Sequence, residues 1–152
     1  MPYVKDLMTK VVVTTSPNKR ALDAARLMKD EGRGCIVIVD GGRPVGILTE
    51  RDFLRKVTAE DVSPSKVYVR DVMSKPLVTI DPDASVRDAA RLMLGRRIRR
   101  LPVVKDNKLV GIIVCTDFAR HMSKKSITEQ ILGAIARSEK RQFSKEVLEA
   151  MR

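Results

Sequence analysis

The chain contains an internal repeat, and this feature constrains its fold more than any other. Compared with itself at an offset of 65 residues, the 152-residue sequence aligns without a gap from Val4/Val69 to Lys56/His121, with 20 identities in 53 positions. Unrelated sequences of ordinary composition would share about 6% of positions, or about three identities. The chain is therefore a duplicated unit. Each copy, at about 55 residues, is too small to bury a good core alone, so the copies should pack on each other.

Hydrophobic periodicity changes in the same order within each copy, which predicts a β-α-β-β-α unit. Two-residue links at Gly41-Gly42 and Asp106-Asn107 predict tight hairpins. Ser85 and Thr49, each followed three residues later by Asp, predict helix N-caps. The predicted segments are strands 11–14, 35–39 and 45–48 with helices over 21–28 and from Thr49, then strands 77–80, 101–104 and 110–114 with helices over 86–93 and from Thr116.

These patterns divide the chain into a first repeat (1–62), a linker (63–68), a second repeat (69–122) and a C-terminal helical extension (123–152). In the extension, Ser126 and Glu129 form a predicted capping box. An apolar stripe runs along the predicted helix and favours packing that closes the module or a dimer, with a partner-binding arm as the alternative. The stripe comprises Ile127, Ile131, Ile135, Phe143, Val147 and Met151.

Composition argues against several classes of protein. Two cysteines without CxxC spacing and one histidine offer too few soft ligands for a zinc site, so no metal or required cofactor is expected. The sequence holds no long apolar run, which argues against a signal peptide or membrane span and favours a cytoplasmic protein. We find no paired-carboxylate motif, nucleophile set or Walker loop, so an enzyme is not expected.

The charge balance indicates an affinity for phosphate in some form. The chain carries 30 Lys+Arg against 19 Asp+Glu, a net charge of +11. Four arginines within Gly95–Arg100 could form a nucleic-acid patch, although Arg96 and Arg97 could equally offset a helix dipole. Charge alone does not distinguish nucleic acid, lipid and nucleotide.

The repeated strings resemble the tandem cystathionine-β-synthase (CBS) domain pair, also called the Bateman module, over residues 4–122. The resemblance implies an α/β (α+β) fold in which two β-α-β-β-α repeats pack with pseudo-twofold symmetry around two clefts, often as a homodimer. It also implies adenine nucleotides or related adenosyl compounds as ligands, bound to regulate another protein. The strings are Val4–Met8 and Val69–Met73, Asp81–Ala89, Arg100–Val104, Gly46–Asp52 and Gly111–Asp117.

Asp52 and Asp117 are the leading candidates for ligand contacts. Each follows a strand and lies in the first turn of a predicted helix, where backbone N–H groups favour a neighbouring anion. A carboxylate there can accept hydrogen bonds from ribose hydroxyl groups. Simple helix capping is the alternative role for both residues.

The family pattern pairs the aspartate of one repeat with strand residues of the other. The first cleft would have more phosphate-binding groups, because arginine grips phosphate in bidentate fashion, and we therefore expect it to bind more tightly. The resemblance implies a first cleft of Thr49, Arg51, Asp52, Leu77, Val78, Arg99, Arg100 and Leu101, and a second cleft of Thr116, Asp117, Val12, Val13, Cys35 and Ile36.

These inferences lead to one main hypothesis and one alternative. The main hypothesis is a regulatory sensor that binds AMP, ADP or ATP and signals to an unidentified partner protein by a conformational change. The alternative is a nucleic-acid-associated CBS protein, with or without nucleotide control, that uses its basic surface.

Overall fold

The computed structural model describes residues 2–121 and 131–138, and it confirms the mixed α/β fold. The chain divides into two compact units, Met1–Thr9 with Ile80–Val103 and Ile112–Arg152 (unit 1), and Lys10–Thr79 with Val104–Gly111 (unit 2). The units interleave along the sequence, so they are a different division of the chain from the two repeats. The repeat boundaries at 62 and 69 stay a prediction.

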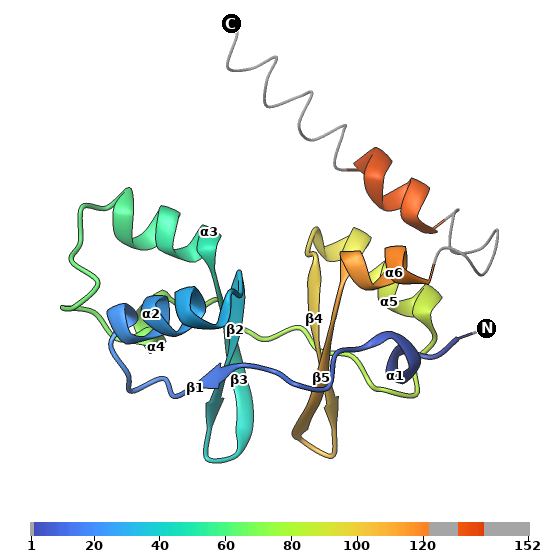
Figure 1. The fold of residues 1–152 in the computed structure, drawn as a ribbon, viewed down its shortest axis with the longest axis horizontal. Helices are drawn as coiled ribbons and strands as arrows, with labels where there is room; N and C mark the ends of the chain where they lie inside the picture. The colour runs from blue at the N-terminus through green and yellow to red at the C-terminus, as the bar shows by residue number, and fades with distance from the viewer. Residues whose placement is uncertain (1, 122–130, 139–152) are drawn as a thin grey trace, which may run out of the picture. The chain divides into compact units, whose positions relative to one another are not determined.

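Unit 2 is built on a three-stranded sheet in the order β1-β2-β3 (Figure 1). The edge strand β1 (Thr14–Thr15) runs parallel to β2 (Cys35–Asp40), which pairs antiparallel with β3 (Arg43–Thr49). Gly41 and Gly42 join β2 to β3 with φ angles of 57° and 78°. Positive φ at both central positions is the geometry of a type I′ turn, which confirms the predicted hairpin.

Helices cover the apolar residues of this sheet. The long helix α2 (Ala21–Glu31) precedes β2, and the short α3 (Glu50–Phe53) continues directly into the π-helical segment η1 (Leu54–Thr58). The helix α4 (Val69–Val72) packs against α2. The buried core of unit 2 draws on α2, β2, β3, η1 and α4 and consists of Ala21, Ala24, Met28, Ile36, Ile38, Leu48, Val57, Val69 and Val72.

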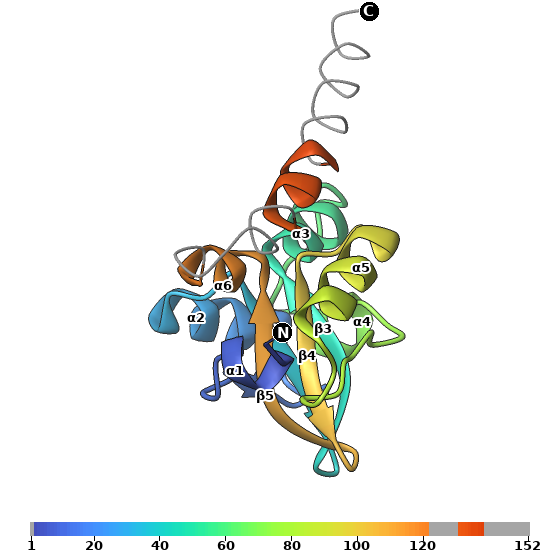
Figure 2. The same ribbon diagram turned by 90° about the vertical axis from the view of Figure 1, so that its right-hand side faces the viewer.

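Unit 1 contains the equivalent helices. They are α1 (Val4–Leu7), α5 (Val86–Arg96) and α6 (Cys115–Arg120). Strands β4 (Arg100–Lys105) and β5 (Lys108–Val114) form the second hairpin (Figure 2), with φ angles of 50° and 63° at Asp106 and Asn107. The Ser85 Oγ accepts the backbone N–H of Asp88 at 3.0 Å, which confirms this predicted N-cap.

Part of the predicted C-terminal helix is also described. Residues 131–138 are helical, and Ile135 on the predicted apolar stripe is buried. The predicted capping box and the other stripe positions, except Ile131, lie outside the described residues. Within residues 2–121 and 131–138, every helix is too short or too polar to cross a lipid bilayer.

The helix that leads each repeat packs on the long helix of the other repeat. The Val4 N–H donates to the Ala84 carbonyl at 2.9 Å, and the Val69 N–H donates to the Lys19 carbonyl at 2.8 Å. Contacts join α1 to α5 and α4 to α2. Each core is therefore completed by a segment from the neighbouring repeat, which periodicity within one repeat does not reveal.

The predicted first strands are shorter than expected, and the two repeats differ. In the first repeat, the Val37 N–H donates to the Val13 carbonyl, and β1 forms beside β2. The position equivalent to Val37 is Pro102, which has no N–H to donate. Over the predicted strand 77–80 only an isolated bridge, Ile80 to Val103, remains. A missing donor therefore explains the missing strand.

A stability prediction follows from the ends of the two long helices. The capping residue after α2 is Gly32 with φ 63°, and its counterpart after α5 is Arg97 with φ 55°. A side chain in this left-handed region is strained, whereas glycine is not. Replacing Arg97→Gly should raise the free energy of unfolding by about 0.5–1 kcal/mol, measured by urea denaturation.

Gly32→Ala is the matched control. A Cβ atom at Gly32 would meet no other heavy atom within 4 Å, so this substitution isolates backbone strain. It should lower the free energy of unfolding by about 1 kcal/mol. Lower stability in Arg97→Gly would contradict the strain argument.

Candidate functional site

The first candidate carboxylate, Asp52, caps the helix that follows β3. The Thr49 N–H donates to the Asp52 Oδ2 at 2.9 Å, and the Asp52 N–H donates to the Thr49 Oγ1 at 3.3 Å. This reciprocal pair confirms the capping box predicted at the helix start. It holds the carboxylate at the end of the strand, with 6% of the residue exposed.

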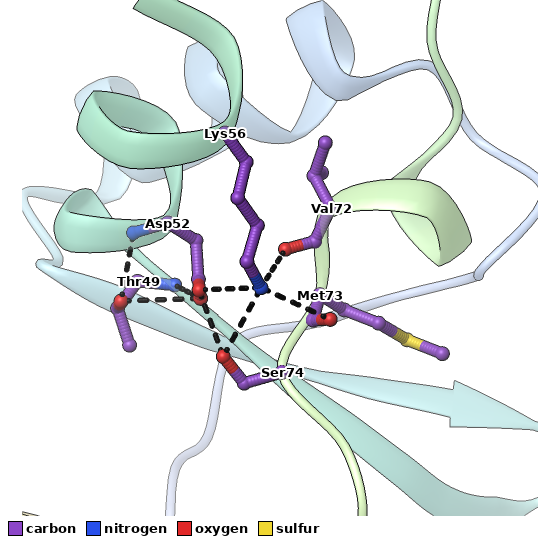
Figure 3. A network of polar contacts seen from close by, with 6 residues as sticks. All are labelled: Thr49, Asp52, Lys56, Val72, Met73 and Ser74. Carbon is purple, nitrogen blue, oxygen red and sulfur yellow. Dashed lines mark hydrogen bonds and ion pairs between the residues drawn. The ribbon is translucent and has the colours of Figure 1, made fainter. Parts of the chain in front are cut away.

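The other oxygen of Asp52 is engaged by residues that the sequence reasoning did not identify (Figure 3). The Ser74 hydroxyl donates to Oδ1 at 2.8 Å, and the Lys56 ammonium lies 3.0 Å from the same oxygen. Lys56 also donates to the Val72 carbonyl at 2.9 Å. The i, i+4 spacing of Asp52 and Lys56 is readable from sequence. The Ser74 contact is not, because it depends on tertiary packing 22 residues along the chain.

Ser74 is held in place by its backbone. Its N–H donates to the Ile47 carbonyl at 2.8 Å, and the Ile47 N–H donates to the Ser74 carbonyl at 3.2 Å. A Cβ atom added at Gly46 would lie 2.7 Å from the Met73 Sδ, so the glycine allows this segment to lie close against β3. The segment around Ser74, near the start of the second repeat, is therefore held beside β3 and Asp52.

The second candidate carboxylate, Asp117, has the same backbone arrangement but different partners. The Val114 N–H donates to the Asp117 Oδ2 at 2.7 Å. The helix begins at Cys115 rather than at the predicted Thr116, because the cap falls at Val114, the position equivalent to Thr49. Asp117 caps its helix without help from a hydroxyl group.

The two aspartates differ most at Oδ1. Asp117 is 1% exposed, and its Oδ1 accepts no hydrogen bond from any residue that the structure describes. The Arg120 guanidinium lies 3.5 Å away as an ion-pair partner, with 71% of its side chain exposed. A buried acceptor without a hydrogen bond is unfavourable in a folded protein and therefore suited to receive a donor.

The remaining predicted site residues are distributed over both units. Ile36 and Leu101 are fully buried, while Arg51, Arg99 and Thr116 are exposed. The others are half-buried, namely Val12, Val13, Cys35, Thr49, Leu77, Val78 and Arg100. Each predicted cleft takes residues from unit 1 and unit 2, so both clefts stay predictions.

Unit 2 also carries a surface pocket of about 430 Å³ that the sequence did not suggest. It contains none of the predicted ligand residues. Its lining consists of Ala25, Met28, Lys29, Gly32, Arg33, Gly34, Glu50 and Phe53.

The Asp52 network predicts a difference between two hydroxyl residues at equivalent positions. Ser74→Ala should lower the free energy of unfolding by about 1 kcal/mol, because the buried Asp52 carboxylate loses a partly buried hydrogen bond. Thr9 is the counterpart of Ser74, and its hydroxyl makes no hydrogen bond within the described residues. Thr9→Val should therefore change stability by less than about 0.5 kcal/mol in the same urea titration. Equal losses in the two variants would contradict a specific role for the Ser74 hydroxyl.

Known proteins are similar to this chain over most of its length. The CBS domain model matches residues 4–59 and 69–124. The CBS domain-containing protein YhcV of Bacillus subtilis is 43% identical over 127 residues, covering 83% of this chain and 90% of that protein.

Solved structures of CBS domain proteins have the same fold. A conserved CBS domain protein of Thermoplasma acidophilum superposes with a TM-score of 0.79 at 28% identity, over 91% of this chain and 76% of that one. The CBS domain pair of protein MJ0100, in complex with 5′-methylthioadenosine and S-adenosyl-L-methionine, superposes with a TM-score of 0.74 at 29% identity, over 83% and 99% of the two chains. The chain thus belongs to the CBS domain family and carries two CBS domains.

Proposed function

We propose that this chain is a regulatory module, without catalytic activity of its own, that binds an adenine-containing ligand. The observation that carries the proposal is the buried Asp117 Oδ1, which accepts no hydrogen bond from the described residues. Ribose presents two adjacent hydroxyl donors, and a carboxylate accepts such a pair well. The CBS domain pair of MJ0100, which binds two adenosine compounds, supports adenosine as the shared chemistry.

The residues predicted from sequence complete this proposal. Aliphatic side chains of the strands would accept the apolar base, as ligand pockets generally require. Phosphate groups of AMP, ADP or ATP would need cationic partners, since a guanidinium matches a phosphate in bidentate fashion, but the predicted Arg99 and Arg100 belong to the cleft of Asp52 and not to that of Asp117. A ligand that contacts both repeats would favour one conformation of the pair of repeats over others. A partner protein would respond to that change of conformation.

Self-association is part of the same proposal. Leu54 on η1 is 62% exposed, so it is available for contact with a second copy of the chain. We propose a homodimer in the cytoplasm, with a separate regulated protein as its partner. Sedimentation of the full chain at several concentrations measures the dimer directly.

A basic surface supports the alternative function in nucleic-acid binding. Arg96 at the end of α5 is exposed, as are Arg97 and Arg99 on the short connection to β4. Binding through such residues would depend steeply on salt and little on sequence. Fluorescence anisotropy with a labelled DNA duplex and a labelled RNA strand, at about 50 and 200 mM salt, tests this alternative.

The ligand proposal is tested by thermal denaturation and titration calorimetry. We expect AMP, ATP or S-adenosylmethionine to raise the melting temperature, because a ligand that binds only the native state stabilises it. At a ligand concentration about 100 times the Kd, the gain is about 2.7 kcal/mol. GMP serves as the control for the adenine base. No shift with any adenine compound, combined with salt-dependent binding of DNA or RNA, would favour the alternative.

A further inference from the structure

We propose that Lys56 and Ser74 close Asp52 to ligands, so that Asp117, and not Asp52, takes ligand hydroxyl groups. The inference rests on the proposed function and sharpens it, because it predicts one adenosine ligand per chain. It also reverses the expectation from arginine content that the cleft containing Asp52 binds more tightly.

The Asp52 carboxylate has no acceptor capacity left. A carboxylate offers about four lone-pair positions. Oδ2 receives the Thr49 N–H at 2.9 Å and the Thr49 hydroxyl at 3.2 Å. Oδ1 receives the Ser74 hydroxyl at 2.8 Å and the Lys56 ammonium at 3.0 Å. A ribose hydroxyl must therefore displace one of these donors before it can bind (Figure 3).

Both donors on Oδ1 are held near it by further contacts. The Lys56 ammonium is also bound to the Val72 carbonyl at 2.9 Å and lies within 3.5 Å of the Met73 carbonyl and the Ser74 Oγ. The backbone of Ser74 pairs with Ile47 through two hydrogen bonds. Displacing Lys56 would break a charge-assisted contact and leave a backbone carbonyl without its donor.

Asp117 has the same scaffold without the two donors. Thr9 pairs with Ile112 through two backbone hydrogen bonds of 2.9 and 3.0 Å, as Ser74 pairs with Ile47. His121 stands at the position equivalent to Lys56. Within the described residues, neither the Thr9 hydroxyl nor the His121 imidazole forms a hydrogen bond to Asp117.

Among the described residues, the cation beside the Asp117 Oδ1 is Arg120, which can move away at little cost. Arg120 lies 3.5 Å from this oxygen, beyond the usual distance of a charge-assisted hydrogen bond, and its side chain is mostly exposed. A ligand hydroxyl would give this buried oxygen its first hydrogen bond instead of replacing an existing one. The exchange is therefore favourable at Asp117 and unfavourable at Asp52.

Titration calorimetry of the full chain with AMP and with S-adenosylmethionine tests the assignment. We expect one ligand per chain, at least a tenfold loss of affinity in Asp117→Asn, and a change of less than threefold in Asp52→Asn. Thermal melts of each variant identify any that fail to fold. Two ligands per wild-type chain, or a loss of affinity confined to Asp52→Asn, would overturn the proposal.

Exchanging the residues that differ between the repeats provides a reciprocal test. Lys56→His with Ser74→Thr gives the first repeat the residues of the second, and should add a second binding event per chain. Thr9→Ser with His121→Lys gives the second repeat the residues of the first, and should weaken binding at least tenfold. Unchanged stoichiometry and affinity in both pairs would refute the role of these residues.

The same variants distinguish failure of the proposed function, which is the binding of an adenine-containing ligand, from failure of the assignment of that ligand to Asp117. If wild type binds AMP or S-adenosylmethionine but the variants behave contrary to expectation, the assignment to Asp117 fails and the proposed function stands. If wild type binds no adenine compound, the proposed function fails together with the role of Asp117. In that case the double variant Lys56→His with Ser74→Thr tests the closure of Asp52 by itself. Binding of an adenine compound by this variant would support the closure, and no binding would contradict it.

Discussion

The exchange of leading helices is the constraint on which the rest of this structure depends. A repeat of about 55 residues buries too little apolar surface to be stable alone. Val69 and Val72, which lead the second repeat, are buried in the core that contains Ala21 and Ala24 of the first. The backbone hydrogen bond from the Val69 N–H to the Lys19 carbonyl fixes that packing. The two CBS domains are therefore structurally interdependent, although each is a separate match to the family.

The same exchange builds the environment of Asp52. Once α4 is docked on α2, the chain that follows it must run along β3, and Ser74 pairs with Ile47. The Ser74 hydroxyl then reaches the carboxylate at the start of α3. A contact formed by this packing thus engages one oxygen of the carboxylate that the family resemblance assigns to ligand binding.

Duplication provided two equivalent scaffolds, and single substitutions made them unequal. Pro102 in place of Val37 removes a backbone donor and with it a strand. Val114 in place of Thr49 removes a capping hydroxyl, while His121 in place of Lys56 removes an ammonium group. The backbone pairing of Thr9 with Ile112 and of Ser74 with Ile47 is nonetheless retained. Side chains, and not the backbone, therefore distinguish the two carboxylates.

The sequence by itself determined the repeat, the long helices α2 and α5, both hairpins and the caps at Thr49 and Ser85. These features depend on residues within a few positions of one another, where periodicity and turn chemistry act directly. The family and both candidate aspartates were also identified from strings of adjacent residues.

Only the tertiary structure decided which segments complete each core and which donors occupy each aspartate. Hydrophobic periodicity identifies an apolar face but not its partner, so the pairing of α1 with α5 and of α4 with α2 was not predicted. The partners of Asp52 include Ser74, and a hydrogen bond over that distance in sequence exists only after the chain has folded. Sequence therefore identified the candidate carboxylates, whereas packing determined which of their atoms were already engaged.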